Sequence, residues 1–435
     1  MTDQEQSQQL SPSRPVIHRG PWIVTGVSSE PSGFEQKPLK DGALLVADGL
    51  IQAIGRYRDI KKEFGQYHIQ DHEGKVLVPA LINGHCHLEL SHLDFPNHVQ
   101  DHKSYNGEIT GWIRDLLSER ERFYRENADA EKLILHHARQ ALQRMSAEGV
   151  AFIGDVGNLL ASRTIGEDQN TRVSFLLELL GLTKESERKT FARFENVTAD
   201  DFLGIVCTPH APYSTTPALI KAMKMQADRQ NHIVSIHVAE SMQEVEFLQS
   251  GTGTLKEFLL AREAWDGSFT IPAKGSVQYL DSLGVLDSKT ICVHGVHVDK
   301  GEIKILSKKK VKVCLCPGSN RFLGVGKAPV TEFLDHGILP ALGTDSKASN
   351  LELSMWREMR LLREDHPGLS PESVFAMATR GGAEAWEVAS EMGSLEPGKQ
   401  PLILAVSNND KIDSPGEIFD FLTSAGESVQ KEWLG

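Results

Sequence analysis

Two histidines, His85 and His87, follow the apolar run VLVPALING and are separated by a single residue. On an extended strand, residues two positions apart point to the same side, so both imidazoles face one way while Cys86 faces the other. Two imidazoles on one side can chelate a single metal ion. An isolated His-x-His pair is more often a surface or hydrogen-bonded pair, so the metal hypothesis depends on partners elsewhere in the chain.

Further histidines and carboxylates follow three later apolar runs. His237 and Glu240 stand in HIVSIHVAES, His294 stands with His297 in ICVHGVHVD, and Asp345 occurs in ALGTDSKASN. A single buried histidine is more often a core residue with satisfied hydrogen bonds than a metal ligand. Three histidines with a carboxylate, however, are a ligand set that suits zinc or ferrous iron. The recurrence of this pattern after several runs therefore favours a metal site.

The elements that carry these residues alternate between strand-like and helix-like patterns over residues 81–390. Segments such as ENADAEKLILHHARQALQRMSAEG and PALIKAMKMQADRQN repeat apolar residues at spacings of three and four, which is typical of amphipathic helices. Eight short apolar runs, which we interpret as strands, are LINGHCH, GVAFIGDV, RVSFLLELLG, LGIVCTPH, HIVSIHVAE, TICVHGVH, KVCLCPGSN and ILPALGTDS. Eight βα repeats predict an α/β fold built as a (β/α)8 TIM-like barrel.

The candidate residues lie at the carboxyl ends of these runs. The first run ends with His85 and His87, and the fourth ends with His210. The fifth to eighth runs end with His237, Glu240, His294, Ser319, Asn320 and Asp345. In a parallel barrel these ends share one rim, where active sites lie, so we expect residues distant in the sequence to meet there.

Both ends of the chain are expected to form a second, smaller domain. Residues 16–80 contain short β-rich runs separated by Gly and Asp turn signals, and residues 391–435 begin with a turn followed by the strand-like run PLILAVS. We predict a small β-sandwich domain from residues 16–80 plus 391–435, beside a barrel of residues 81–390. The polar residues 1–15 are expected to be a disordered tail.

The composition narrows the class of partner. The 435 residues include 46 basic and 59 acidic side chains, and the resulting net charge of −13 disfavours general binding to nucleic acid or to an anionic membrane. No run approaches the roughly 18 apolar residues of a membrane helix, and five cysteines are too few for a disulfide framework. We expect a cytoplasmic protein with a small-molecule substrate, with a homodimer as an open alternative to a monomer.

Taken together, the candidate residues resemble the motifs of a known family. His85-x-His87, His237 with Glu240, His294, and Asp345 in GTDS are similar to those of the amidohydrolase superfamily, in its cytosine- and adenosine-type deaminase branch. The resemblance covers nearly the whole chain, including the split β domain and the turn LEPGK. After that turn, QP replaces the usual Ala-Asp, which concerns a local turn and not the chemistry.

The resemblance implies a role for each residue of the pattern. The metal ligands would be His85, His87, His237 and Asp345. Glu240 would be the proton shuttle, Asp345 would also accept a hydrogen bond during catalysis, and His294 would contact the attacking water or the leaving amine. Two-metal members of the superfamily carry a lysine at the end of the fourth strand, where this chain reads CTPH. We therefore expect one divalent metal ion, zinc in the first place and iron as the alternative.

Three more runs bear on the substrate. His210, in PHAPYS, resembles the substrate-binding histidine of deaminases that act on adenine nucleosides. The runs HLELS, with Glu89, and CPGSNR, with Ser319, Asn320 and Arg321, resemble those of the aminodeoxyfutalosine deaminases of menaquinone biosynthesis. The implied reaction is hydrolytic deamination of the adenine ring of aminodeoxyfutalosine, with release of ammonia.

Two further residues are expected to bind that substrate, which carries a benzoate. The planar guanidinium of Arg321 can bind a carboxylate through two hydrogen bonds, although a surface arginine paired with a neighbouring acid is an equal alternative. Trp112, in ITGWIRDLL, is expected to cover the purine or the ribose, and a buried helix aromatic is its alternative.

Three alternative functions are consistent with the same residues. The substrate could be methylthioadenosine, S-adenosylhomocysteine or adenosine. A barrel of this type could instead hydrolyse a ring amide or a carbon–chlorine bond, since a metal site and Glu240 serve either reaction. A non-catalytic scaffold is the third class, but such a protein would not be expected to keep every metal ligand.

Overall fold

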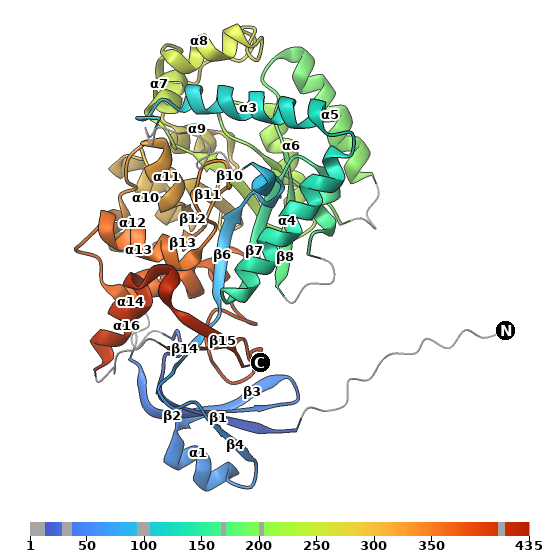
Figure 1. The fold of residues 1–435 in the computed structure, drawn as a ribbon. Coiled ribbons are helices and arrows are strands. Elements are labelled where there is room, and N and C mark those ends of the chain that lie inside the picture. Colours follow the sequence, from blue (N-terminus) through green and yellow to red (C-terminus); the bar gives the residue numbers. More distant parts are fainter. Residues whose placement is uncertain are drawn as a thin grey trace, which may run out of the picture.

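The computed structural model describes residues 14–27, 37–93, 105–166, 171–199, 204–407 and 414–434. The chain forms a large α/β part with parallel strands and a seven-stranded sheet at one end (Figure 1). Most of the predicted tail, residues 1–15, lies outside the described residues. Among the described helices, none is long and apolar enough to cross a membrane.

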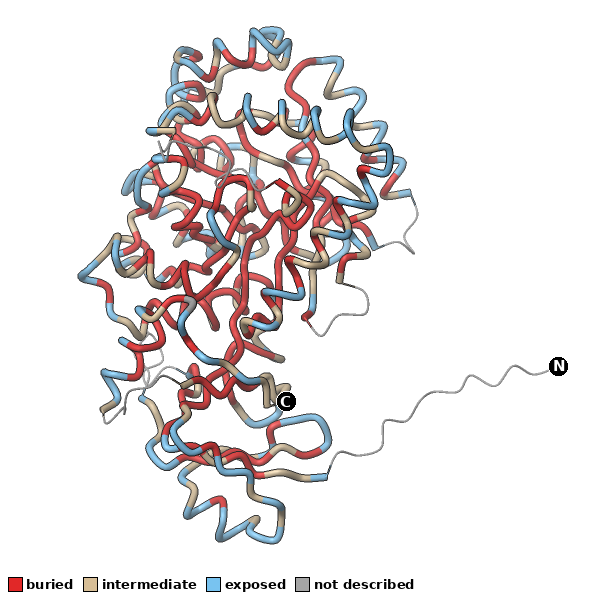
Figure 2. Tube along the Cα trace, viewed as in Figure 1, coloured by how far each residue is buried: buried red, intermediate tan, exposed pale blue. Residues whose placement is uncertain are grey.

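Each of the eight predicted strand runs contains a strand, and these strands form two parallel sheets of four. One sheet holds β6 (Leu81–Cys86), β7 (Val150–Gly157), β8 (Arg172–Leu179) and β9 (Val206–Pro209) in that order. The other holds β10 (Val234–Val238), β11 (Thr290–His294), β12 (Lys312–Leu315) and β13 (Ala341–Leu342). Most of these residues are buried, as expected for parallel strands covered on both faces (Figure 2).

The two parallel sheets contact each other at both edges. At one edge, the backbone N–H of His237 in β10 donates to the carbonyl oxygen of His210, just after β9, at 2.9 Å. At the other edge, Cys86 in β6 pairs with Asp345, just after β13, in a parallel bridge. The backbone N–H of Asp345 also donates to the carbonyl oxygen of His85 at 3.1 Å. The carboxyl ends of the strands therefore gather on one side of the molecule.

Helices connect the parallel strands and cover them. They are α3 (Ile109–Glu126), α4 (Ala130–Ala147), α5 (Lys184–Thr198), α6 (Pro217–Arg229), α7 (Met242–Ser250), α8 (Thr254–Ala261), α9 (Ser276–Leu283), α10 (Lys300–Lys309), α11 (Pro317–Leu323), α12 (Val330–Asp335), α13 (Met355–Asp365), α14 (Pro371–Ala376) and α15 (Gly382–Ala385). The predicted helical segments at 126–149 and 217–231 contain α4 and α6. Helices α3 and α8 lie at the end of the molecule away from the seven-stranded sheet (Figure 1).

The seventh predicted run differs from the structure at its end. Strand β12 stops at Leu315, and α11 begins at Pro317, so Ser319 and Asn320 lie in a helix and not at a strand end. Proline suits the first helical position because its fixed φ is helical and its missing N–H would have no partner there. Pro317 therefore starts a helix where the apolar pattern had predicted that the strand continues.

Both chain ends contribute to the seven-stranded sheet. Its strands are β1 (Val16–Ile23), β2 (Leu39–Ala47), β3 (Leu50–Arg56), β4 (His68–Asp71), β5 (Val76–Pro79), β14 (Ile403–Ser407) and β15 (Gln430–Trp433). The order is β15-β14-β5-β1-β2-β3, with β4 paired to β1, and the short helix α1 (Tyr57–Phe64) joins β3 to β4. Only one residue separates β5 from β6, so the sheet is tied directly to the parallel strands.

The last helix, α16 (Pro415–Ser424), packs against the large part of the molecule. The ring of Phe419 lies 6.1 Å from that of Phe375 in α14, and Arg363 in α13 bonds to the carboxylate of Asp420 at 2.7 Å. The segment 391–435, assigned as a whole to the small domain from the sequence, thus contributes β14 and β15 to the sheet and α16 to the helical layer.

The indole of Trp386 is packed in the interior of the molecule, against β6 and β7. Its indole Nε1 donates to the carbonyl oxygen of Gly84 at 2.9 Å, and its ring lies 5.5 Å from that of Phe152. The ring also occupies the space beside Gly154 in β7, where an added Cβ would lie 2.0 Å from the indole. Close packing of this kind tolerates no extra methyl group without movement of the neighbouring atoms.

We predict that Gly154→Ala lowers the free energy of unfolding by about 1–3 kcal/mol, the scale of an overpacked core. The midpoint of thermal unfolding should fall by several degrees. Gly416→Ala is the matched control, because Gly416 lies in α16 with no atom within 4 Å of the added Cβ. An unchanged midpoint for Gly154→Ala would show that the indole can move freely.

Candidate metal and active site

At three strand ends that lead into the site, one residue has a left-handed backbone conformation. The φ angle is +50° at Ala239, +71° at His294 and +56° at Asp345. Residues other than glycine rarely adopt this conformation, and it persists where the surrounding structure holds it in place. Gly343 lets its segment approach the backbone of His85 closely, because a Cβ at Gly343 would lie only 2.8 Å from the backbone N and O of His85. The lack of this side chain lets Asp345 lie beside His85.

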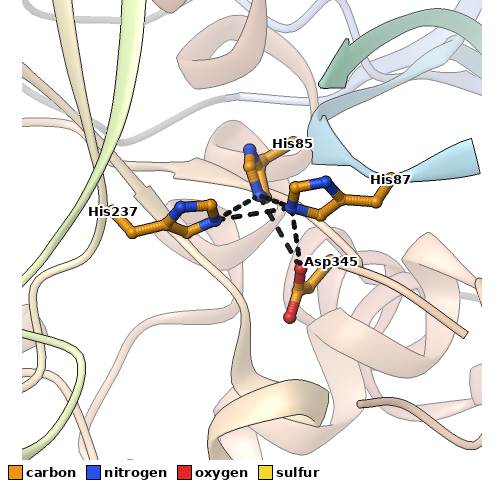
Figure 3. A group of neighbouring side chains, drawn as sticks. All are labelled: His85, His87, His237 and Asp345. Carbon is orange, nitrogen blue, oxygen red and sulfur yellow. Dashed lines mark hydrogen bonds and ion pairs between the residues drawn. The ribbon is translucent and has the colours of Figure 1, made fainter. Parts of the chain in front are cut away.

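The three predicted histidine ligands converge on one point. The Nε2 atoms of His85 and His87 are 3.1 Å apart, those of His85 and His237 are 3.2 Å apart, and those of His87 and His237 are 3.4 Å apart (Figure 3). All three side chains are buried. The structure thus brings together imidazoles from two different sheets.

Asp345 completes this group with one of its two carboxylate oxygens. Its Oδ1 lies 3.7 Å from Nε2 of His85 and 3.5 Å from Nε2 of His87. Its Oδ2 accepts hydrogen bonds from the hydroxyls of Ser319 and Ser349, both at 2.6 Å. The two hydroxyls orient the carboxylate so that Oδ1 faces the imidazoles.

The donor set fits a divalent metal ion. Nδ1 of His237 lies 2.9 Å from the carbonyl oxygen of His210, so it carries the proton and leaves Nε2 with a free lone pair. Burial, followed by the neighbouring imidazoles, lowers the pKa of His85 well below its ordinary value, and burial lowers the pKa of His237 to about 3. Neutral imidazoles whose Nε2 lone pairs face one another cannot form hydrogen bonds between these atoms, because none of them carries a proton. A cation placed among them would bind all three.

Glu240 and His294 lie next to this group as a pair. Oε1 of Glu240 is 3.5 Å from Nε2 of His294, and Nδ1 of His294 is 3.0 Å from Oδ1 of Asn320. Burial raises the pKa of Glu240. The backbone N–H of Glu240 donates to the buried carboxylate of Glu244 at 3.1 Å, which fixes the turn after β10. The pair offers a carboxyl group that can hold or release a proton beside the metal-binding group.

The group opens into a cavity of about 440 Å³. Its polar lining includes His87, Glu89, Arg120, Asn158, Glu178, His210, Ser214, His237, Glu240, Arg262, Glu263, His294, Asp345 and Ser346. Apolar side chains from α3, α8 and neighbouring segments line the rest, among them Leu90, Trp112, Ile113, Leu116, Leu117, Leu180, Leu182, Phe258 and Leu259. A molecule with one polar and one apolar half would fit these walls.

Three predicted substrate-binding residues line the cavity. His210 has its Nδ1 at 2.7 Å from the hydroxyl of Ser214, which leaves its Nε2 available. Glu89 accepts the backbone N–H of Leu159 at 2.7 Å, and Trp112 donates from Nε1 to the carbonyl oxygen of Ala348 at 3.0 Å. These contacts hold the side chains at the cavity wall.

The other predicted substrate-binding residues do not line the cavity. Ser319 instead donates a hydrogen bond to Asp345, and Asn320 forms one with His294. Arg321 is turned to the outside of α11, where its guanidinium bonds to Glu364 at 2.7 Å and to Asp365 at 2.8 Å. This is the surface ion pair that stood as the alternative, and Arg321 does not line the cavity.

Sequence reasoning missed Glu178, Asn158, Arg120, Arg262 and, apart from Trp112, the apolar wall. Glu178 is in the run RVSFLLELLG, at the end of the third strand, and the strand-end argument applied to the other runs would have found it. Arg120 lies on α3, whose position over the strand ends has no signal in the spacing of residues. Helix α3 and the apolar residues of α8 become cavity walls only once the chain has folded.

Three comparisons with known proteins agree with this geometry. The sequence profile of the amidohydrolase family matches residues 76–429. A protein of Pelotomaculum thermopropionicum named 5-methylthioadenosine/S-adenosylhomocysteine deaminase is 29% identical over 403 residues, which cover 90% of this chain and 86% of the relative.

Two solved structures are similar in fold. Helicobacter pylori aminofutalosine deaminase in complex with methylthio-coformycin has a TM-score of 0.79 and 22% identity, and the match covers 95% of this chain and 97% of the other. An adenosine deaminase from Xanthomonas campestris with bound zinc has a TM-score of 0.71 and 22% identity, covering 95% and 90%. The family profile spans most of the sequence, from before His85 to beyond Asp345, and the chain therefore belongs to the amidohydrolase family.

Proposed function

We propose that the protein is a metal-dependent hydrolytic deaminase of the adenine ring of a nucleoside, with aminodeoxyfutalosine as its substrate. The observation that carries the proposal is the meeting of three imidazoles, Asp345 and Glu240 at one end of a cavity that also exposes His210. Relatives that cover most of the chain at 26–29% identity are named as deaminases of adenine nucleosides. Methylthioadenosine and S-adenosylhomocysteine are the alternative substrates.

The proposal includes the architecture that supports this site. The two parallel sheets, in contact at both edges, would together form an eight-stranded barrel over residues 81–390, and the seven-stranded sheet would be the core of the small domain. The ligands would be His85, His87, His237 and Asp345, and the bound ion would be a single zinc. A divalent ion held there lowers the pKa of bound water toward about 7. The five cysteines are free and buried, which suits the cytoplasm.

In this reaction Glu240 moves the proton. Its carboxylate accepts a proton from the attacking water and delivers it to the ring nitrogen beside the attacked carbon. His294, 3.5 Å from Glu240 and oriented by Asn320, would contact the water or the departing amine. His210 would bind the ring through its free nitrogen. If the substrate carries a carboxylate, Arg120 and Arg262 are the guanidinium groups at the cavity that can meet it.

The direct test is product analysis with the metal-loaded protein and a panel of adenine nucleosides. We expect the ultraviolet shift from an adenine to a hypoxanthine chromophore, together with one ammonia per turnover. Aminodeoxyfutalosine should be the best substrate. Chloride release from a chlorinated triazine, without any ammonia from the nucleosides, would contradict the proposal and favour the chlorohydrolase alternative.

Metal content is a separate prediction. Elemental analysis should find one divalent ion per chain, because the four ligand atoms lie within 4.8 Å of one another. His237→Ala should lose most of this metal, since it removes one of the three imidazoles. His232→Ala is the matched control, because His232 precedes the opposite end of the same strand. Two ions per chain, or full metal content in His237→Ala, would rule out this ligand set.

The role of Glu240 is tested by Glu240→Gln. The amide keeps the shape of the side chain but cannot carry the proton, so turnover should fall on the order of a hundredfold or more. Metal content should stay unchanged, since Glu240 is not a ligand. Glu246→Gln, on the exposed side of α7, serves as control and should retain full activity. Near-normal turnover in Glu240→Gln would mean that another group carries the proton.

A further inference from the structure

Glu178, at the end of β8, is a buried carboxylate that belongs neither to the proposed metal ligands nor to the proposed proton path. Its side chain is 5% exposed and lines the cavity. Oε2 accepts a hydrogen bond from Nδ2 of Asn158 at 3.2 Å, whereas Oε1 has no hydrogen-bond partner among the described residues. A buried acceptor without a partner costs free energy, on the order of 1–3 kcal/mol. A bound molecule that donates a hydrogen bond to Oε1 would remove this cost.

His237 does not supply that hydrogen bond. Its Nδ1 is 3.6 Å from Oε1 of Glu178 but only 2.9 Å from the carbonyl oxygen of His210, which therefore takes the N–H. Arg120 does not reach Glu178 directly either. Its Nη1 lies 3.5 Å from Oδ1 of Asn158, and this contact turns the amide nitrogen of Asn158 toward Glu178. Oε2 of Glu178 is thus held by Asn158, Oε1 is buried without a partner among the described residues, and the side chain is part of the cavity lining.

The place of Glu178 relative to the metal-binding group limits what it can bind. In Figure 3 the Nε2 atom of His237 faces the other ligands and the Nδ1 atom points away from them. Glu178 lies on the Nδ1 side, so the imidazole ring separates it from the position of the reacting amino group. A donor that meets Glu178 must therefore belong to a more distant part of the substrate.

The chemistry of an adenine nucleoside then identifies the donor. An ionised carboxylate only accepts hydrogen bonds. The unprotonated ring nitrogens of adenine are acceptors as well, and in the proposed reaction the 6-amino group would lie beside the metal ligands. The hydroxyls of the sugar are the remaining donors that every such nucleoside shares.

We infer that Oε1 of Glu178 accepts a hydrogen bond from a sugar hydroxyl of the nucleoside, and that this contact makes the enzyme prefer ribonucleosides to deoxyribonucleosides. The inference rests on the proposed deaminase function and adds a substrate-binding residue and a substrate class to it. A site built to bind a hydroxyl strongly rejects the analogue that lacks it, because the buried acceptor is then left unpaired.

The test measures kcat/KM for adenosine, 2′-deoxyadenosine and 3′-deoxyadenosine with the metal-loaded protein and with Glu178→Ala. The wild type should prefer adenosine to at least one deoxynucleoside by ten- to a hundredfold or more, the range for a lost hydrogen bond to a charged group. Glu178→Ala should lose about the same factor with adenosine and little with that deoxynucleoside. If the alanine variant fails to fold, Glu178→Gln preserves the volume and keeps a neutral acceptor, so it should retain a preference for adenosine that is weaker than that of the wild type, and an unchanged preference would contradict the inference.

Metal content distinguishes binding of substrate from support of His237. Glu178→Ala should keep its single ion, and Glu185→Ala, an exposed position in the first turn of α5, should change neither metal content nor preference. Equal losses with all three nucleosides, loss of the ion, or a second ion in the wild type that disappears in Glu178→Ala would each overturn the inference. A wild type that deaminates no adenine nucleoside would instead refute the proposed function.

Discussion

The mutual approach of three imidazole nitrogens is the constraint on which the rest of the site depends. Atoms that carry lone pairs lie 3.1–3.4 Å from one another in a buried space, beside one carboxylate oxygen. This arrangement is unfavourable for neutral side chains by themselves and favourable around a cation. Two parallel sheets, left-handed strand ends and the hydroxyls on Asp345 hold these groups in place, and a bound ion would offset the cost of the arrangement.

Buried carboxylates fix the loops that carry the reacting groups. Asp155 accepts the first backbone N–H after His87, at 2.8 Å, and Glu244 accepts the backbone N–H of Glu240. Glu358 does the same for Gly318 at 2.7 Å, at the start of α11. Burial raises the pKa of Glu244 and of Glu358 to about 7. Each loop is thus bound to the interior by a hydrogen bond to a side chain that does not line the cavity.

Much of the site could be predicted because its residues follow strands, and strand ends in parallel sheets meet at one side. The types of these residues and their places after apolar runs favoured a metal site, and the family resemblance supplied the choice of the four candidate ligands. Arg321 could not be placed in this way, since its direction depends on α11 and on Glu364 and Asp365, which lie far along the chain. The apolar wall from α3 and α8 also has no local signal, because helix periodicity identifies a buried face without identifying what it covers.

The most direct test of the account is anomalous X-ray scattering from crystals of the zinc-loaded protein. The account predicts one anomalous peak, about 2.0–2.2 Å from Nε2 of His85, His87 and His237 and from Oδ1 of Asp345. A peak held by Glu178 and His210 instead, or no peak among the three imidazoles at full zinc content, would contradict it.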